Sequence, residues 1–162
     1  MLQHFNQNVD QIKISKVQYF SIAICFLMNV LDGMDVLVIS YSAPAISQAF
    51  SLGPKALGIV FSAGLIGMAI GAVFLAPYAD KFGRKKLILA SAFIMGFSVL
   101  LTSLSENILQ LVIMRLISGL GIGCMLATTA ALTSENVLNN SKDFWVSIVL
   151  SGYPVGAVIS GY

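Results

Sequence analysis

A short charged segment between two long apolar runs constrains the fold of this chain more than any other feature. The segment Ala79–Lys86 holds four of the nine Lys and Arg residues. The runs on either side of it, Leu57–Tyr78 and Leu87–Leu104, contain no Asp, Glu, Lys or Arg. As helices rising about 1.5 Å per residue, runs of this length cross most of a bilayer core about 30 Å thick. A basic loop is typical of the cytoplasmic side, so the pattern predicts two membrane-spanning helices joined by a cytoplasmic turn.

The composition of the chain also indicates that its solvent is lipid. Of its 162 residues, 57% are hydrophobic and 10% are charged, and the mean hydropathy is +0.89. Soluble domains have about 25% charged residues, so this chain has too little polar surface for a soluble globule. We therefore expect an all-α membrane protein. The net charge of +2 does not indicate a nucleic-acid partner, because the enrichment of basic residues on one side of a membrane explains it.

Five apolar runs predict five membrane-spanning helices after a polar leader over residues 1–16. The helices are expected at about 17–42, 57–78, 87–104, 108–133 and 144–162. With the leader inside, seven basic residues fall on the cytoplasmic side: Lys13, Lys16, Lys81, Arg84, Lys85, Lys86 and Lys142. Lys55 falls in an external loop, and Arg115 lies within a span. This asymmetry predicts that the N-terminus is inside.

Three charged residues within the predicted spans are the first candidates for a functional site. Asp32 and Asp35 follow Asn29 at intervals of three on the first span, so successive side chains differ by only about 60° around the helix. Arg115 lies on the fourth span. A charge in hydrocarbon costs on the order of 3 kcal/mol, so such residues pair with one another, line a wet cavity or serve transport.

Two interpretations of these charges are open. They form a structural ion pair inside the bundle, or they line a pathway for a proton or an anionic substrate. A carboxylate in a poorly hydrated cavity can bind and release a proton near neutral pH, and an arginine stays charged and can hold a carboxylate. Because intramembrane charges are usually functional, the sequence favours the pathway.

Glycines on the second and fourth spans predict faces where helices pack closely. Gly67 and Gly71 lie on the second span, and Gly119, Gly121 and Gly123 lie on the fourth. Small residues let the backbones of two membrane helices approach each other. A phosphate-binding loop is disfavoured, because no strand precedes these glycines and no Gly-Lys-Ser/Thr follows them.

The residues that usually hold metals are few and badly placed for that purpose. Cys25 and Cys124 lie within apolar runs, and His4, the only histidine, lies in the polar leader. Their spacing matches no metal-ligand pattern, so we expect no metal site and no cofactor. No nucleophile with a matching base is visible, which disfavours an enzyme.

Two motifs together resemble the major facilitator superfamily of transporters. The segment Asp80–Lys86 resembles the loop between the second and third helices of that superfamily. The pattern Arg115-x-x-x-Gly119-x-Gly121-x-Gly123 resembles a motif of its fourth helix. The two occur in the right order and with the expected spans. The resemblance covers about residues 17–162 and implies a helical bundle, the N-terminal half of such a carrier.

A further motif resembles one family within that superfamily, the aromatic acid/proton symporters. Leu31–Asp35 is similar to their Asp-Gly-x-Asp signature, and Ala43–Ala45 and Gly152–Gly156 fit the same family. The resemblance implies the uptake of benzoate-like or related organic acids together with a proton, across a bacterial inner membrane. A sugar porter, a drug/proton antiporter and an inactive membrane fragment are the alternatives.

The resemblance also implies roles for the candidate residues. Asp32 and Asp35 would serve proton coupling or substrate handling, with Arg115 beside them in a central cavity. A cytoplasmic gate would consist of the turn around Gly83 and four charged residues. These four are Asp80, Arg84, Lys85 and Glu135. Within the gate we expect Arg84 and Glu135 to pair, because they lie at the same level of the membrane.

The length of the chain sets one more expectation. Superfamily carriers consist of two six-helix halves that bind the substrate between them, and five spans supply less than one half. The partners expected for this chain are therefore the missing C-terminal half, membrane lipid, a small organic acid and a proton. The chain is either a fragment of a longer gene product or a truncated reading frame.

Overall fold

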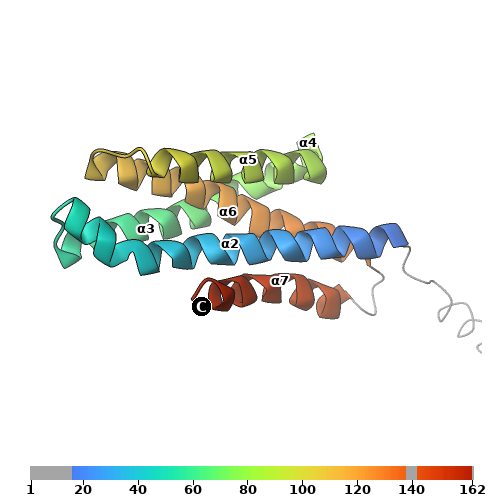
Figure 1. Ribbon diagram of the computed structural model, residues 1–162. Helices are drawn as coiled ribbons and strands as arrows, with labels where there is room; N and C mark the ends of the chain where they lie inside the picture. Colours follow the sequence, from blue (N-terminus) through green and yellow to red (C-terminus); the bar gives the residue numbers. More distant parts are fainter. Residues whose placement is uncertain (1–15, 138–141, 162) are drawn as a thin grey trace, which may run out of the picture.

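A computed structural model describes residues 16–137 and 142–161 of the chain as an all-helical bundle (Figure 1). Its long helices are α2 (Lys16–Ala49), α3 (Pro54–Ile70), α5 (Arg84–Thr102), α6 (Ile108–Asn136) and α7 (Lys142–Ile159). A π-helical turn η1 (Gly71–Leu75), a 3-10 turn η2 (Ala76–Tyr78) and the short helix α4 (Ala79–Phe82) join α3 to α5. The predicted all-α architecture is confirmed. The leader expected over residues 1–16 lies outside the described residues except for Lys16, where α2 begins.

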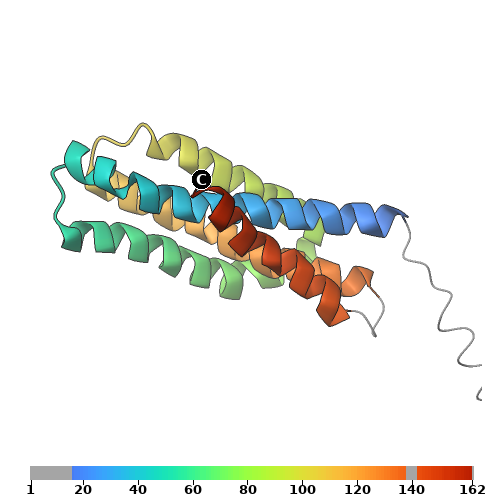
Figure 2. The same ribbon diagram turned by 60° about the horizontal axis from the view of Figure 1, so that its bottom comes forward.

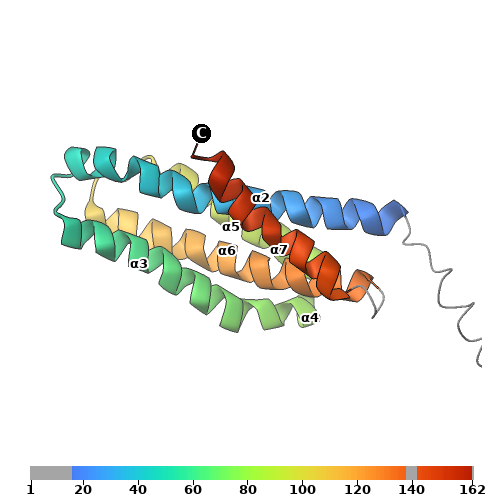
Figure 3. The ribbon, with the colours of Figure 1, turned by 90° about the horizontal axis from the view of Figure 1, so that it is seen from below.

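Helix α6 lies at the centre of the bundle. It packs against α3 and α5 and makes further contacts with α7 and α2, whereas α2 packs mainly against α7. The helices run roughly alongside one another in an elongated bundle (Figure 2), and α7 crosses α2 obliquely (Figure 3). The glycine-rich middle of α6 is accordingly the most buried part of the molecule.

Four helical segments in the described residues are long and apolar enough to cross a membrane. They are Gln18–Ala49, Pro54–Phe82, Arg84–Thr102 and Ile108–Asn136. Large apolar side chains point outward, such as Phe93, which is 72% exposed, and Leu100, which is 67% exposed. Lipid rather than water suits such a surface. Helix α7 begins with Lys142 and Asp143 and is not among these four, so the fifth span stays a prediction.

Three predicted boundaries are corrected by the structure. Helix α2 continues through Pro44 to Ala49, although the first span was expected to end near residue 42. Proline is tolerated in membrane helices because neighbouring groups satisfy the freed backbone carbonyl. The charged segment is not an open loop, since it is helical except at Gly83. Glu135 lies in the last turn of α6 and not beyond its end.

Close backbone contacts hold α6 against α3. A Cβ at Gly67 or Gly71 would overlap the backbone of Leu116 or Leu120, respectively. From the opposite side, a Cβ at Gly123 would overlap the backbone of Met68. Only glycine permits this approach, which lets two backbones pack directly in a solvent where hydrophobic burial contributes little.

The other predicted packing glycines also lie at helix crossings. A Cβ at Gly119 would overlap the backbone of Gly64 on α3, and Gly121 faces Ser91 on α5. A further pair, absent from the predicted set, joins α2 to α7. Gly33 lies against the backbone of Tyr153, and Gly156 lies against that of Val30. Helix α7 therefore crosses α2 along the segment that includes Val30 and Gly33, on either side of Asp32 in the sequence.

Most basic residues of the described chain, other than Lys55 and Arg115, lie at one end of the bundle. The turn at Gly83, the end of α6 and the start of α7 lie together there, beside the first turns of α2 (Figure 1). Lys55, at the start of α3, lies at the opposite end. The described members of the predicted inside group thus lie at the opposite end of the bundle from Lys55, and Lys13 lies outside the described residues.

Candidate functional site

Two of the three intramembrane charges meet inside the bundle. The Nη1 atom of Arg115 on α6 lies 3.4 Å from Oδ2 of Asp35 on α2 and donates a hydrogen bond to it. The side chains are only 11% and 13% exposed, respectively. The Nε atom of Arg115 is buried and has no hydrogen-bond partner in the part of the chain that the structure describes. The guanidinium is thus held by one carboxylate and retains a free donor.

This ion pair lies on the wall of a cavity of about 210 Å³ between α2, α3 and α6. Apart from the pair, the lining is mostly apolar, with Ser40 and Ser118 as polar exceptions. The apolar lining is Val36, Ile39, Val60, Phe61, Gly64, Leu65, Met68, Gly119 and Ile122. A cavity that combines apolar walls with one charged pair suits a small ligand with an apolar body and an ionised group.

Asp32 lies in a different environment from Asp35. Its side chain is completely buried, and neither carboxylate oxygen has a hydrogen-bond partner among the described residues. Asp32 is not among the residues that line the cavity. Tyr153 on α7 lies at the crossing with α2, where its backbone meets Gly33, between the two aspartates in the sequence. Tyr153 was not among the candidate residues predicted from the sequence. The only indication in the sequence was that a polar aromatic residue stands beside Pro154 in an otherwise apolar run.

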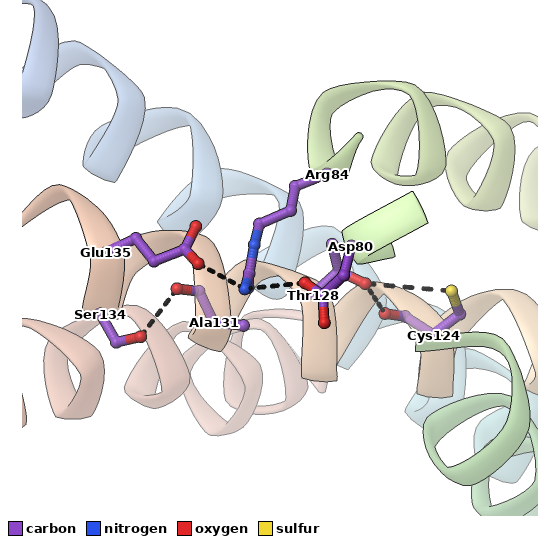
Figure 4. Close-up of polar contacts among 7 residues, drawn as sticks. All are labelled: Asp80, Arg84, Cys124, Thr128, Ala131, Ser134 and Glu135. Carbon is purple, nitrogen blue, oxygen red and sulfur yellow. Dashed lines mark hydrogen bonds and ion pairs between the residues drawn. The ribbon is translucent and has the colours of Figure 1, made fainter. Parts of the chain in front are cut away.

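A second charged cluster lies at the basic end of the bundle (Figure 4). Nη2 of Arg84 lies 2.6 Å from Oε1 of Glu135 and 3.2 Å from Oδ1 of Asp80. The side chain of Arg84 is 18% exposed, whereas those of Asp80 and Glu135 are 72% and 57% exposed. One guanidinium therefore joins the start of α5 to α4 and to the end of α6.

Gly83 makes this cluster possible. Its φ of 90° and ψ of 130° separate α4 from α5 without a longer loop, and other residues are strained at such a positive φ. The backbone conformation of Gly83 leaves Arg84, at the start of α5, within hydrogen-bond distance of Asp80 on α4. Lys85 is exposed and lines the same wide surface cleft as the three paired residues.

Metal chemistry has no support in the described residues. No group of three or more His, Cys, Asp or Glu side chains there could hold a metal ion. Cys25 and Cys124 are both buried and not joined in a disulfide. His4 lies outside the described residues.

Comparison with known proteins supplies the family. The model of the Major Facilitator Superfamily matches residues 25–162. The chain is 33% identical over 156 residues to a gallate transporter of Pseudomonas putida, covering 95% of this chain and 34% of that protein. It is 34% identical over 149 residues to the 4-hydroxybenzoate transporter PcaK of Pseudomonas aeruginosa, covering 92% and 33% of the two chains.

A third relative has a related name. The chain is 34% identical over 140 residues to a 3-(3-hydroxy-phenyl)propionate transporter of Escherichia coli, covering 86% of this chain and 35% of that protein. The chain thus spans about a third of the length of the curated relatives that it matches. The predicted similarity to the aromatic acid transporters is confirmed. With its apolar helices and a family match from residue 25 onward, the chain belongs to the Major Facilitator Superfamily.

Proposed function

We propose that this chain is the N-terminal part of a proton-coupled secondary transporter that takes up aromatic or related organic acids. The observation that carries the proposal is the Asp35–Arg115 pair on the wall of a mostly apolar cavity. The names of the relatives, which are transporters of gallate, 4-hydroxybenzoate and a hydroxyphenyl propionate, agree with it.

An aromatic acid has a carboxylate and an apolar ring, and the cavity offers a binding partner for each. Its carboxylate can take the place of Asp35 on the guanidinium of Arg115, where a planar donor group binds a carboxylate at two points. Its ring would lie against apolar side chains such as Phe61 and Met68.

The competition for Arg115 couples the acid to a proton. When the substrate carboxylate binds Arg115, Asp35 loses its counter-charge and becomes unfavourable as an anion in a poorly hydrated site. Binding a proton removes that charge. Substrate and proton therefore favour each other's binding, as symport requires.

The exposed cluster of Asp80, Arg84 and Glu135 serves as the gate on the inner side in this proposal. Its contacts hold the ends of α4, α5 and α6 together, and separating them opens a path to the cavity. Gly83 allows the tight turn, and Lys85 keeps this end on the cytoplasmic side of the inner membrane. A cysteine at Lys85 should react with an impermeant thiol reagent in inverted vesicles and not in intact cells.

Uptake measurements test the function directly. Radiolabelled 4-hydroxybenzoate is supplied to membrane vesicles at acidic external pH, with a protonophore as the control for coupling. The vesicles contain either this chain alone or this chain with the C-terminal half of a superfamily carrier that completes its fold. We expect uptake only with the second half present, because the substrate binds between the halves.

Variants of the ion pair then connect uptake to this cavity. Arg115→Gln should abolish uptake, whereas Lys55→Gln, which neutralises a residue at the opposite end of the bundle, should leave it unchanged. Full uptake by the Arg115→Gln carrier, or uptake that is insensitive to the protonophore, would refute the proposed mechanism.

A further inference from the structure

A buried hydrogen bond links α2 to α6 one helical turn before Asp32. The side chains of Asn29 and Thr129 are both completely buried, and Nδ2 of Asn29 donates to Oγ1 of Thr129 over 3.2 Å. The neighbouring buried hydroxyl of Thr128 donates instead to the carbonyl of Cys124 on its own helix. The Asn29–Thr129 bond is therefore a contact between helices that the adjacent threonine does not share.

The partners of Asn29 determine the orientation of its amide. Nδ2 also donates to the backbone oxygen of Cys25 over 2.8 Å. The single hydroxyl hydrogen of Thr129 is used within α6, on the carbonyls of Met125 or Leu126 at 2.9 and 3.1 Å. Both groups that face the Asn29 amide are thus acceptors, so they require its NH₂ end. The carbonyl end, Oδ1, must face elsewhere.

Three buried acceptor atoms without a donor result from this arrangement. They are Oδ1 of Asn29 and both carboxylate oxygens of Asp32, and none of them has a partner among the described residues. A buried acceptor without a donor is costly in a medium of low dielectric constant. A proton on Asp32 turns one of these acceptors into a donor. Residues three apart on a helix have Cβ atoms about 5–6 Å apart, so Asn29 is a neighbour that can accept this hydrogen.

The charged and titratable groups around Asp32 offer no better partner for its hydrogen. On α2 the nearest is Asp35, which already accepts a hydrogen bond from Arg115 of α6. On α7 it is Tyr153, beside the crossing at Gly33, and its phenol forms no hydrogen bond with Asp32 in the described part of the chain. Asp32 is not among the residues that line the cavity, so its environment differs from that of the Asp35–Arg115 pair.

We propose that Asn29 is the acceptor that holds the proton of Asp32, and that Thr129 is the positioning residue that keeps the Asn29 carbonyl turned toward it. This inference deepens the proposed function, in which Asp32 takes part in proton coupling. Thr129 acts through the amide alone. Without its hydroxyl, only the Cys25 carbonyl still holds the NH₂ end of the amide. The amide then rotates more easily and presents its NH₂ group to Asp32 more often, which favours the ionised carboxylate.

Infrared spectroscopy of this chain, purified into lipid nanodiscs, tests the inference without any transport assay. A protonated carboxyl group has a C=O stretching band that an ionised carboxylate lacks, and the Asp32 band is identified by its loss in Asp32→Asn. We expect Thr129→Val to change the frequency of that band and to move its titration midpoint to lower pH. The loss of one hydrogen bond corresponds to a proton affinity that is roughly tenfold weaker.

Thr128→Val is the matched control. It makes the same substitution at the adjacent buried position, whose hydroxyl bonds to Cys124 of its own helix, and should leave the Asp32 band unchanged. Thr129→Ser should retain the wild-type band, and Thr129→Ala should reproduce the shift if the valine variant does not fold by circular dichroism. Equal spectra for the Thr129 and Thr128 variants, or the absence of an Asp32 band in the wild type, would overturn the inference. Because no substrate is present, these outcomes are independent of whether the carrier transports aromatic acids.

Discussion

Two clusters of oppositely charged side chains include residues of α6, and they differ in their surroundings. Arg115 lies about two turns from the start of α6, and Glu135 lies in its last turn. The Asp35–Arg115 pair is nearly buried, at 13% and 11% exposure, and its N–O distance is 3.4 Å. In the Asp80–Arg84–Glu135 cluster the acids are mostly exposed, although Arg84 lies 2.6 Å from Glu135. The shorter contact is the weaker one in energy, because water and salt screen it. Burial, and not the N–O distance, therefore determines how strongly the charges of each cluster interact.

This difference fits the two proposed roles. Removal of one partner from the buried pair leaves a charge in a poor solvent, so the pair responds strongly to a ligand that competes for one member. The exposed cluster can break and re-form at little cost, which suits a gate that opens in every cycle. If the two roles are correct, variants of the buried pair should affect stability most and variants of the exposed cluster least.

The largest effect is expected when one partner of the buried pair is removed. Asp35→Asn should lower the free energy of unfolding by about 3–5 kcal/mol, because Arg115 is left buried without its counter-charge. Thermal unfolding in detergent, followed by circular dichroism, measures the change. The double variant Asp35→Asn/Arg115→Gln should recover a large part of the loss. Additive losses in the double variant would mean that the two side chains do not interact.

A smaller effect is expected when the contact between α3 and α6 is forced apart. Gly123→Leu places a side chain against the backbone of Met68, which cannot move aside as a side chain can. We expect a loss of up to about 3 kcal/mol in the free energy of unfolding. Gly96→Leu on α5 is the control, since a Cβ there meets nothing within 4 Å. If both variants unfold at the same temperature, the close approach of α3 and α6 is not needed.

The turn that supports the exposed cluster should be less sensitive. Gly83→Ala strains a backbone that has φ of 90° and should cost about 1–2 kcal/mol. Gly53→Ala is the matched control, because Gly53 also precedes a helix but has φ of −75°. The same melting experiment measures both variants. A Gly83→Ala protein as stable as Gly53→Ala would contradict the described turn.

The smallest effect is expected within the exposed cluster itself. Arg84→Glu and Glu135→Arg should each destabilise the protein, and the double exchange should recover about 0.2–1 kcal/mol of their summed loss. Added salt should reduce this recovery, because both acids of the cluster are exposed. The same salt should change the coupling between Asp35 and Arg115 much less. Equal salt dependence at the two sites would remove the contrast on which the two roles rest.

Much of the candidate site was predictable because charges in apolar runs are conspicuous. Asp32, Asp35 and Arg115 were identified by their cost in lipid, and Arg84 and Glu135 by their level in the membrane. Helix ends were less predictable, since Pro44 ordinarily indicates a boundary, yet α2 continues past it. Tyr153 was not predicted, because a single tyrosine in an apolar run, even beside a proline, does not indicate which residues of other helices it will meet. Its proximity to the aspartates depends on where α7 crosses α2.

The sequence by itself determined that these helices belong in a membrane, which residues in them are charged, and which glycines allow close contact. Those properties follow from the composition and the helical periodicity of each segment, which do not depend on the neighbouring helices. Only the tertiary structure decided that Asp35 lines a cavity with Arg115 while Asp32 lies buried beside Asn29. The two aspartates are one turn apart on α2, and their difference comes from α3, α6 and α7, which approach that turn from different sides. Periodicity describes one helix, whereas solvent access and pairing depend on its neighbours.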